Sequence, residues 1–481
     1  MLITGIFVDR KQLINRLAEF LPAQSIIHEQ EALRPYECDG LPAYRQLPLL
    51  AVLPDTIEQV QQVMRVCHDM QVPVVARGAA TGLSGGALPL SDGVLLGLSK
   101  FSRIIEINKQ ARTARVQPGV RNLAISEAAK KYELYYAPDP SSQIACTIGG
   151  NVAENSGGVH CLKYGLTVHN VMEVTVITPQ GELLTIGGAA LDTPGFDLLA
   201  LMNGSEGMLG IVVEVLVKLL PIPTRAQVMM AAFDDIEKAA DSVGAIIAEG
   251  IIPAGLEMMD SLAIQAAEDF VKAGYPVDAR AILLCELDGT NEEVSVQIKQ
   301  VRELLQASGA TEVRTARDEE ERELFWKGRK AAFPAVGRMS PDYYCMDGTV
   351  PRSRLSEVLT GISKLSEVYD LPVANVFHAG DGNLHPLILY NANNPGELKR
   401  AEDFGAEILE LSVKVGGTIT GEHGVGYEKV HQMCVQFSEP ELEQFRAVKK
   451  AFDPQLMLNP GKAIPQPKSC SEHKTIGGHQ H

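Results

Sequence analysis

The sequence lacks the cysteine pattern of an iron–sulfur protein. Its 8 cysteines are scattered, no CxxC pair occurs, and no spacing matches a ferredoxin-type cluster. We therefore expect reduced cysteines and no cluster in this chain. If the chain carries out redox chemistry, its electrons must leave through another carrier or a partner.

An excess of positive charge and long apolar runs are also missing. The formal net charge of −17 argues against a nucleic-acid partner, because phosphate binding needs a positive surface. A small anionic substrate stays possible, since a few local Arg and Lys side chains can outweigh the global field. The N-terminus shows no signal-peptide pattern, and the most apolar segments, 211–222 and 243–256, contain charges and are too short to span a bilayer. We expect a soluble cytoplasmic protein, with peripheral attachment to the inner face of a membrane as an alternative.

What is present is the composition of a large globular protein. The 481 residues predict two or three domains, and 45% apolar with 21% charged residues is the composition of a globular protein. Glycine is dense from 78 to 210. After Pro221 and Pro223 strands and helices alternate with few glycines, which predicts an α+β domain with helices on one face of an antiparallel sheet. Strands are expected at 50–53, 72–76, 228–233 and 281–287, and a hairpin at 377–390. Helices are expected at 10–20, 56–70, 235–249, 292–308, 395–415 and 442–452. We expect the polar end, 469–481, to be frayed.

Three glycine clusters indicate an anion-binding domain. The first, 77–86, follows an expected strand and contains Arg77, Thr81 and Ser84, whose polar groups suit a phosphate. Its spacing matches neither GxGxxG nor the P-loop, and a flexible surface turn is the alternative for this segment alone. Similar clusters at 146–158 and 204–213 favour a long cofactor that lies across several backbone segments.

The segment 377–386 contains a candidate metal site. Asp381-Gly382 between apolar flanks is a strong signal for a two-residue hairpin turn, which would place His378 directly opposite His385. A lone histidine is more often structural, but an opposed pair favours a shared cation. Glu422, between Gly421 and His423, can supply a third ligand, and two imidazoles with one carboxylate form a common open site for a divalent ion.

This order of motifs resembles the FAD-binding domain of the vanillyl-alcohol oxidase and para-cresol methylhydroxylase (PCMH) superfamily. From about Leu49 to Lys462 the chain is similar to its branch of D-lactate, D-2-hydroxyglutarate and glycolate dehydrogenases, and most of all to the FAD subunits of bacterial glycolate oxidases. The resemblance implies an N-terminal helical extension (1–47), a PCMH-type FAD-binding domain (48–225), a substrate domain with an antiparallel sheet (226–425), and a C-terminal helical segment (426–481) that returns to the flavin site.

The same resemblance implies which residues bind FAD. Arg77 to Gly82 and Ser84 to Gly86 would bind the pyrophosphate, and Asn155 to Gly158 the pyrophosphate and ribityl chain. The isoalloxazine would lie near Pro138, Asp139, Thr147, Gly149 and Gly150. The segment from Glu206 to Ile211 would hold the adenine side, and Asn459 would return from the C-terminus to the flavin. The full set is Arg77, Gly78, Ala79, Ala80, Thr81, Gly82, Ser84, Gly85, Gly86, Pro138, Asp139, Thr147, Gly149, Gly150, Asn155, Ser156, Gly157, Gly158, Glu206, Gly210, Ile211 and Asn459. Relatives with covalent FAD have His in the first loop, and its absence here predicts non-covalent FAD.

For the reaction, the resemblance implies oxidation of a small D-2-hydroxy acid. His378, His385 and Glu422 match the metal ligands, with zinc expected before manganese; His423 matches the catalytic base, Arg329 the group that binds the substrate carboxylate, and Asn383 can hydrogen-bond the substrate. A solvated helix face is the alternative for Arg329. Relatives that take dicarboxylates have a Lys near position 345, where this chain has Cys345, so glycolate or D-lactate is favoured over 2-hydroxyglutarate.

Three other functions remain open at this stage. A metal-independent alcohol, phenol or sugar oxidase would leave the histidine set without a role, a metal-dependent hydrolase would bind a nucleotide in the glycine loops, and a non-catalytic subunit would need neither. The electron acceptor of a dehydrogenase could be a quinone, a soluble carrier or an iron–sulfur partner subunit.

Overall fold

The chain divides into two compact units. The structure, a computed structural model, describes residues 9–190, 194–467 and 470. Unit 1 comprises Met1–Ser156, Leu166–Pro221 and His423–His481, and unit 2 comprises Gly157–Gly165 and Ile222–Glu422. The boundary near the C-terminus therefore falls between Glu422 and His423. Of the end expected to be frayed, 469–481, all but Cys470 lies outside the described residues.

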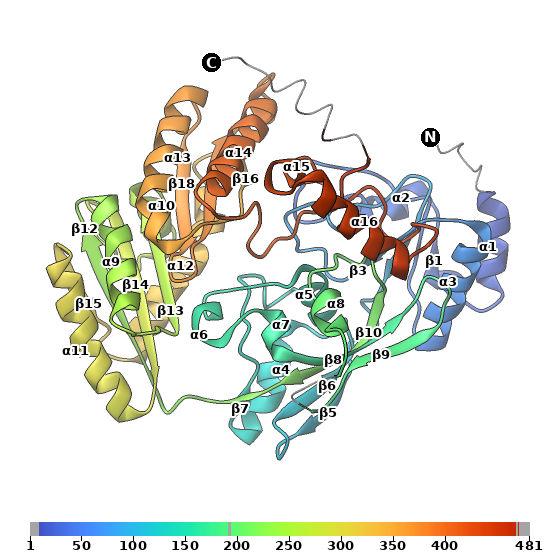
Figure 1. Cartoon of the computed structure of the whole chain (residues 1–481), viewed down its shortest axis with the longest axis horizontal. Coiled ribbons are helices and arrows are strands. Elements are labelled where there is room, and N and C mark those ends of the chain that lie inside the picture. The colour runs from blue at the N-terminus through green and yellow to red at the C-terminus, as the bar shows by residue number, and fades with distance from the viewer. Residues whose placement is uncertain (1–8, 191–193, 468–469, 471–481) are drawn as a thin grey trace. The chain divides into compact units, whose positions relative to one another are not determined.

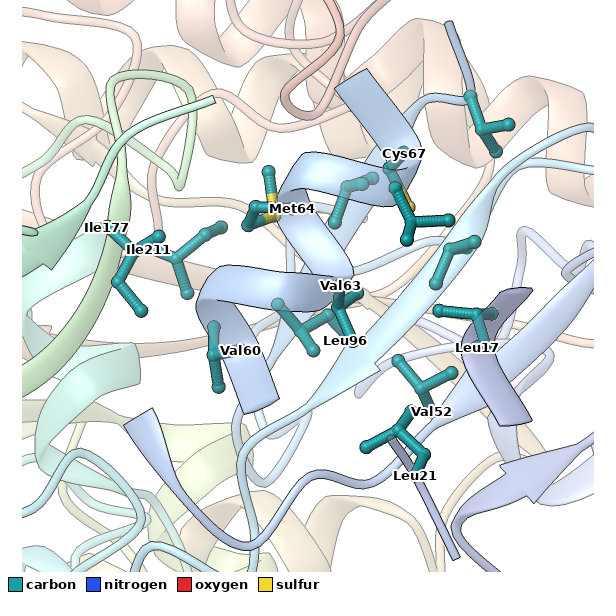
Figure 2. Close-up of a cluster of buried hydrophobic side chains, with 14 of the residues drawn as sticks. Leu17, Leu21, Val52, Val60, Val63, Met64, Cys67, Leu96, Ile177 and Ile211 are labelled. Carbon is teal, nitrogen blue, oxygen red and sulfur yellow. The ribbon is translucent and has the colours of Figure 1, made fainter. Parts of the chain in front are cut away.

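Unit 1 begins with a βαβ arrangement, as the sequence predicts. Strands β2 and β3 both pair in parallel with β4, and helix α3 connects them. The Thr56 hydroxyl caps α3, and the helix buries Val60, Val63, Met64 and Cys67 against the sheet (Figure 2). The elements of this part are α1 (Arg10–Ala18), β1 (Ile26–Ile27), α2 (Gln30–Leu33), β2 (Leu50–Val52), α3 (Ile57–Met70), β3 (Val74–Arg77) and β4 (Val94–Gly97).

A second sheet of unit 1 is antiparallel, in the order β5-β6-β10-β8-β9, and β7 pairs with β11 outside it. Its core includes Val116, Ile148, Val174 and Val215. The elements are β5 (Ile104–Asn108), β6 (Thr113–Val116), α4 (Asn122–Ala129), β7 (Leu134–Tyr135), α5 (Ile148–Glu154), α7 (Thr167–Asn170), β8 (Val171–Ile177), β9 (Leu183–Gly187), α8 (Leu198–Met202), β10 (Ile211–Lys218) and β11 (Leu220–Pro221).

The C-terminal segment returns to unit 1, as expected. It contains α15 (Met433–Gln436) and α16 (Glu439–Phe452), and then Leu458 forms a parallel bridge with Val74 of β3. Cys434 of α15 forms a disulfide with Cys470. The expectation that every cysteine is reduced is therefore wrong for this pair. Their separation of 36 residues gave no sign that the returning chain brings them together.

Unit 2 is built on an antiparallel sheet in the order β15-β12-β14-β13-β18-β19-β16, with β17 beside β19. Strands β13 and β19 are buried at every residue, so both faces of the sheet are covered; the sequence had suggested helices on one face. Helices α10 and α12 pack on each other, whereas α9 packs with α11 and α13 (Figure 1). The elements are α6 (Cys161–Tyr164), β12 (Arg225–Phe233), α9 (Ile236–Ala248), β13 (Gly255–Asp260), α10 (Ser261–Val271), β14 (Ala281–Gly289), α11 (Asn291–Ala307), β15 (Glu312–Thr315), α12 (Glu319–Val336), β16 (Asp342–Cys345), β17 (Gly348–Thr349), α13 (Leu355–Tyr369), β18 (Val373–His378), β19 (Asn383–Tyr390) and α14 (Glu397–Lys414).

Among the helices of the described residues, none combines the length and the apolar character that a bilayer crossing requires.

Candidate active site

The β18–β19 hairpin brings the two predicted histidines to one face of the sheet in unit 2. The expected register is wrong: His378 pairs with Asn383, and His385 pairs with Val376. Residues 379–382 form the connection, longer than the two-residue turn that Asp381-Gly382 suggested. Residues two apart share a face, so His378 and His385 are diagonal neighbours, and their ring centroids lie 5.1 Å apart.

Glu422 completes this set of side chains. Its Oε1 lies 3.0 Å from Nε2 of His385 and 3.5 Å from Nε2 of His378, and the three candidate ligand atoms lie within 4.8 Å of one another. Burial opposes ionisation of Glu422, but hydrogen bonds from the two imidazoles hold its pKa well below the usual value. The set is therefore an ionised carboxylate facing two imidazole Nε2 atoms.

A second carboxylate, Glu257 of β13, fixes the orientation of His378. It is 1% exposed and lies 2.8 Å from Nδ1 of His378, so that Nε2 of the same ring faces Glu422. Burial opposes protonation of His378, yet Glu257 and Glu422 raise its pKa well above the ordinary value. Two imidazole nitrogens and a carboxylate oxygen that converge in this way fit a divalent cation. The pattern carboxylate–histidine–metal is typical of such sites.

Arg329 of α12 is the other partner of Glu257. Its Nη2 lies 2.6 Å from Oε2 of Glu257, and the side chain is 2% exposed. The alternative of a solvated helix face is therefore wrong. Among the described residues, Nε of Arg329 is buried without a hydrogen-bond partner. One carboxylate thus joins the candidate anion-binding arginine to the candidate metal ligand His378.

Asp347 organises the opposite side of the set. It is fully buried, accepts from Nδ2 of Asn383 at 2.9 Å, and accepts from the N–H groups of Gly421 and Glu422, each at 3.1 Å. A Cβ atom at Gly421 would lie 1.5 Å from Nδ2 of Asn383, so only glycine permits this approach. In the described part of the chain, Oδ1 of Asn383 is buried and has no partner. It can accept a hydrogen bond from a substrate.

In unit 1, the first two glycine clusters lie together. A Cβ atom at Gly78 would be 2.3 Å from Oγ1 of Thr147 and 3.8 Å from the backbone N of Gly150, whereas Gly82 has open space around it. Within the described residues, the Thr147 hydroxyl is buried and has no hydrogen-bond partner. Tightly packed glycines with an unpartnered buried hydroxyl fit a bound cofactor with oxygen and nitrogen acceptors.

Other residues predicted to bind a cofactor have protein partners. Arg77 donates to the carbonyl groups of Tyr36 and Cys38, at 2.9 and 2.5 Å. Asn459 donates to the carbonyl groups of Gly86 and Glu206, at 3.1 and 2.8 Å. The C-terminal return therefore joins the first and third glycine clusters.

Two family models match most of the chain. Residues 48–187 match the FAD binding domain, and residues 222–463 match the C-terminal domain of FAD linked oxidases. The chain belongs to the FAD-linked oxidase family. It is therefore an FAD-linked oxidoreductase, and the resemblance stated from its motifs is confirmed.

Curated relatives of this oxidase are similar over nearly the whole chain. The glycolate oxidase subunit GlcD of Escherichia coli K12 is 63% identical over 98% of this chain and 95% of its own length. GlcD of Bacillus subtilis is 39% identical over 89% of this chain and 91% of its own length. The D-lactate dehydrogenase of Anaerostipes hadrus is 32% identical over 94% and 97%.

Solved structures confirm the predicted fold class of this oxidase. A substrate-bound p-cresol methylhydroxylase superposes with a TM-score of 0.80 at 18% identity, covering 96% of this chain and 97% of its own. The 4-ethylphenol oxidase of Gulosibacter chungangensis gives a TM-score of 0.81 at 17% identity, covering 97% and 99%. At this identity the likeness shows the fold alone.

Sequence reasoning missed two carboxylates of the oxidase, Glu257 and Asp347. Glu257 lies between the apolar residues Leu256 and Met258, and a charge in such a position needs a buried partner. This isolated charge was the one sequence feature that indicated a role for Glu257. Asp347 follows directly after the segment 343–346, in which the sequence pattern indicated a role for Cys345 alone.

Proposed function

We propose that this FAD-linked oxidase converts a small D-2-hydroxy acid, glycolate or D-lactate, to the 2-oxo acid. The observation that carries the proposal is the buried set of His378, His385 and Glu422, linked through Glu257 to Arg329. A hydroxy acid presents a hydroxyl and a carboxylate, and the set offers a cation site and a guanidinium. The names of the relatives, glycolate oxidase subunit and D-lactate dehydrogenase, support the same substrates.

Each residue has a separate task in this proposal. Nε2 of His378, Nε2 of His385 and the Glu422 carboxylate would hold a divalent cation, zinc before manganese. When bound, the cation polarises the substrate hydroxyl and FAD accepts the hydride. Arg329 binds the substrate carboxylate through its remaining N–H groups, while Glu257 fixes the guanidinium. Asn383 orients the substrate through Oδ1.

His423 serves as the base. It follows Glu422 directly in the chain, so a base stands one residue from a metal ligand. In its neutral form it takes the proton of the substrate hydroxyl as the α-hydrogen leaves with two electrons. The products are a protonated imidazole, a reduced cofactor and the 2-oxo acid.

Cys345 supports a monocarboxylate substrate. Its Sγ and a ring nitrogen of His385 lie within 4.8 Å of each other, so position 345 is next to the candidate metal ligands. A thiol there provides no cation for a second carboxylate, which favours glycolate or D-lactate over 2-hydroxyglutarate.

The cofactor and the electron acceptor complete the proposal. FAD would be bound without a covalent link, because the loop from Arg77 to Thr81 contains no histidine. Electrons would pass to a quinone or to an iron–sulfur partner subunit, as the word subunit in the name of the relatives suggests. With either acceptor, the protein would work in the cytoplasm or at the inner face of a membrane.

The test is anaerobic bleaching of the visible flavin band by glycolate, D-lactate, L-lactate and D-2-hydroxyglutarate in turn. Glycolate or D-lactate should bleach the band, and His423→Ala should abolish the reaction while FAD stays bound. A band that no hydroxy acid bleaches, in protein with metal bound, would contradict the proposed reaction. If D-2-hydroxyglutarate bleaches the band fastest, it replaces glycolate and D-lactate as the proposed substrate.

A further inference from the structure

Glu206 binds the backbone of the segment that begins with His423. In unit 1, Oε1 of Glu206 accepts from the N–H of Val425 at 2.8 Å, and Oε2 accepts from the N–H of Gly426 at 2.7 Å. The side chain is 6% exposed. A buried carboxylate with one donor on each oxygen forms two strong, charge-assisted hydrogen bonds. These bonds fix two successive peptide groups just after His423.

Other groups of unit 1 hold the same segment. The hydroxyl of Ser84 donates to the carbonyl of His423 at 2.9 Å. The Lys429 ammonium donates to the carbonyl of Gly424 at 3.0 Å. Ser84 therefore binds the carbonyl of His423, Lys429 binds the carbonyl of Gly424, and Glu206 binds the two N–H groups that follow.

The segment needs these restraints because of its glycines. Gly424 and Gly426 both have positive φ, +78° and +55°. Glycines at such positions leave an unrestrained chain with much conformational freedom, which must be lost to hold a neighbouring side chain in one place. A Cβ atom at Gly424 would lie 2.1 Å from Oε2 of Glu154, so the same glycine also permits the close approach of a second buried acid.

Two buried acids of this region, Glu154 and Glu206, differ in what shifts their pKa values. Burial raises the pKa of Glu154 well above its ordinary value, and the nearby Glu206 raises it further. Burial also raises the pKa of Glu206, while the N–H groups of Val425 and Gly426 oppose the shift. The backbone N–H groups of Val425 and Gly426 therefore favour the ionised form of Glu206, whereas the neighbouring Glu206 disfavours the ionised form of Glu154.

We propose that Glu206 is a positioning residue, which fixes the backbone after His423 and thereby sets this imidazole for proton transfer. The inference rests on the proposed function, in which His423 is the base. It is an alternative to the expectation that Glu206 binds the adenine side of FAD, and it is argued from the two backbone N–H groups that the carboxylate accepts. Glu206 does not touch the reacting atoms.

Glu206→Gln in the full-length FAD-loaded enzyme tests this role. The amide keeps the size of the side chain but turns one acceptor into a donor that faces a backbone N–H. With glycolate and a dye as electron acceptor, kcat should fall roughly 10- to 100-fold, because a base misplaced by about 1 Å loses that much rate. KM and the FAD content should stay close to wild type, since neither depends on this loop. Hydrogen exchange of peptides that cover 424–427 should become faster.

The matched control is Glu173→Gln, which removes a carboxylate paired with Arg115 at 2.6 Å in the second sheet of the same unit. It should leave kcat and exchange at 424–427 unchanged. Glu206→Asp keeps the charge but retracts it by one methylene, so its kcat should fall less than that of Glu206→Gln. If Glu206→Gln fails to fold, Glu206→Asp decides the question with the same readouts.

Two outcomes would overturn the inference: unchanged exchange at 424–427 in the Glu206 variants, or loss of FAD as their main defect. The second would restore a role in cofactor binding. If none of the hydroxy acids bleaches the flavin band of the wild-type enzyme, that result alone contradicts the proposed function. Exchange would then still decide whether Glu206 holds the segment.

Discussion

The two units present their polar groups in different ways. In unit 1, glycine-rich loops place backbone groups close together, as where Gly78 meets Thr147 and Gly150. In unit 2, rigid strands present side chains, as where β18 and β19 place His378 and His385 on one face. Backbone N–H groups suit a long cofactor with phosphates, and fixed imidazoles suit a metal ion. Cofactor binding and substrate activation should therefore be separable by mutation.

The largest separation is expected from His385→Ala. Removing one of the three proposed ligands should empty the proposed metal site and lower the turnover of glycolate by roughly 1,000-fold, because hydroxyl activation is lost. FAD should stay bound. Metal analysis and the absorbance of the flavin band test both statements, and His68→Ala on α3 is the control histidine. Loss of FAD from His385→Ala would break the comparison.

A smaller effect is expected from Glu257→Gln in the same unit. The amide can no longer balance the charge at His378 or pair with Arg329, so metal affinity should fall roughly 10- to 100-fold. Titration of the chelated protein with zinc measures this. An unchanged zinc affinity together with a raised KM for glycolate would show that Glu257 serves Arg329 alone.

Unit 2 also buries the carboxylate of Glu286 on β14, which gives a prediction on stability. Burial raises the pKa of Glu286, but hydrogen bonds from His160, Arg322 and Trp326 lower it to about 2. Since the folded pKa lies below the unfolded value, this stabilisation is present above about pH 4.5 and is lost as the pH falls toward 2. Glu286→Gln should therefore lower the free energy of unfolding by about 2 kcal/mol at pH 7 and by less at pH 3.

The single tryptophan, Trp326, makes the measurement possible. Its fluorescence follows denaturant unfolding of the unit that contains Glu286. An equal difference between wild type and Glu286→Gln at pH 7 and pH 3 would contradict the assignment of the effect to this carboxylate.

The smallest effect is expected in unit 1, from Gly149→Ala. A Cβ atom there would lie 2.6 Å from Cβ and 3.1 Å from the carbonyl oxygen of Pro118, and the resulting strain should move the second glycine loop. FAD affinity should fall about 10-fold, while zinc affinity stays normal. Gly188→Ala in the same unit is the control, because its Cβ would meet nothing within 4 Å. Weaker zinc binding in Gly149→Ala would contradict the comparison, because a change in unit 1 would then affect metal binding in unit 2.

The same contrast explains what the sequence could predict. Glycine clusters and the Asp-Gly hairpin are local signals, so the loops, the hairpin and the fold class could be predicted from them and from the family resemblance. The pairing register of β18 and β19 depends on a loop longer than Asp381-Gly382, and two residues do not define it. Glu257 and Asp347 contact their partners only through the folded sheet, and the Cys434–Cys470 disulfide depends on the course of the C-terminal chain. Contacts of this kind leave no local pattern.

The most direct test of the account is metal removal. Wild-type protein is treated with a chelator, freed of it, and mixed anaerobically with glycolate while the flavin band is followed. The account predicts that the chelated protein keeps its FAD, is not bleached, and regains bleaching when one equivalent of zinc or manganese is added. Full-rate bleaching by protein shown to be free of metal would contradict it, and would assign the chemistry to FAD and His423 without His378, His385 and Glu422.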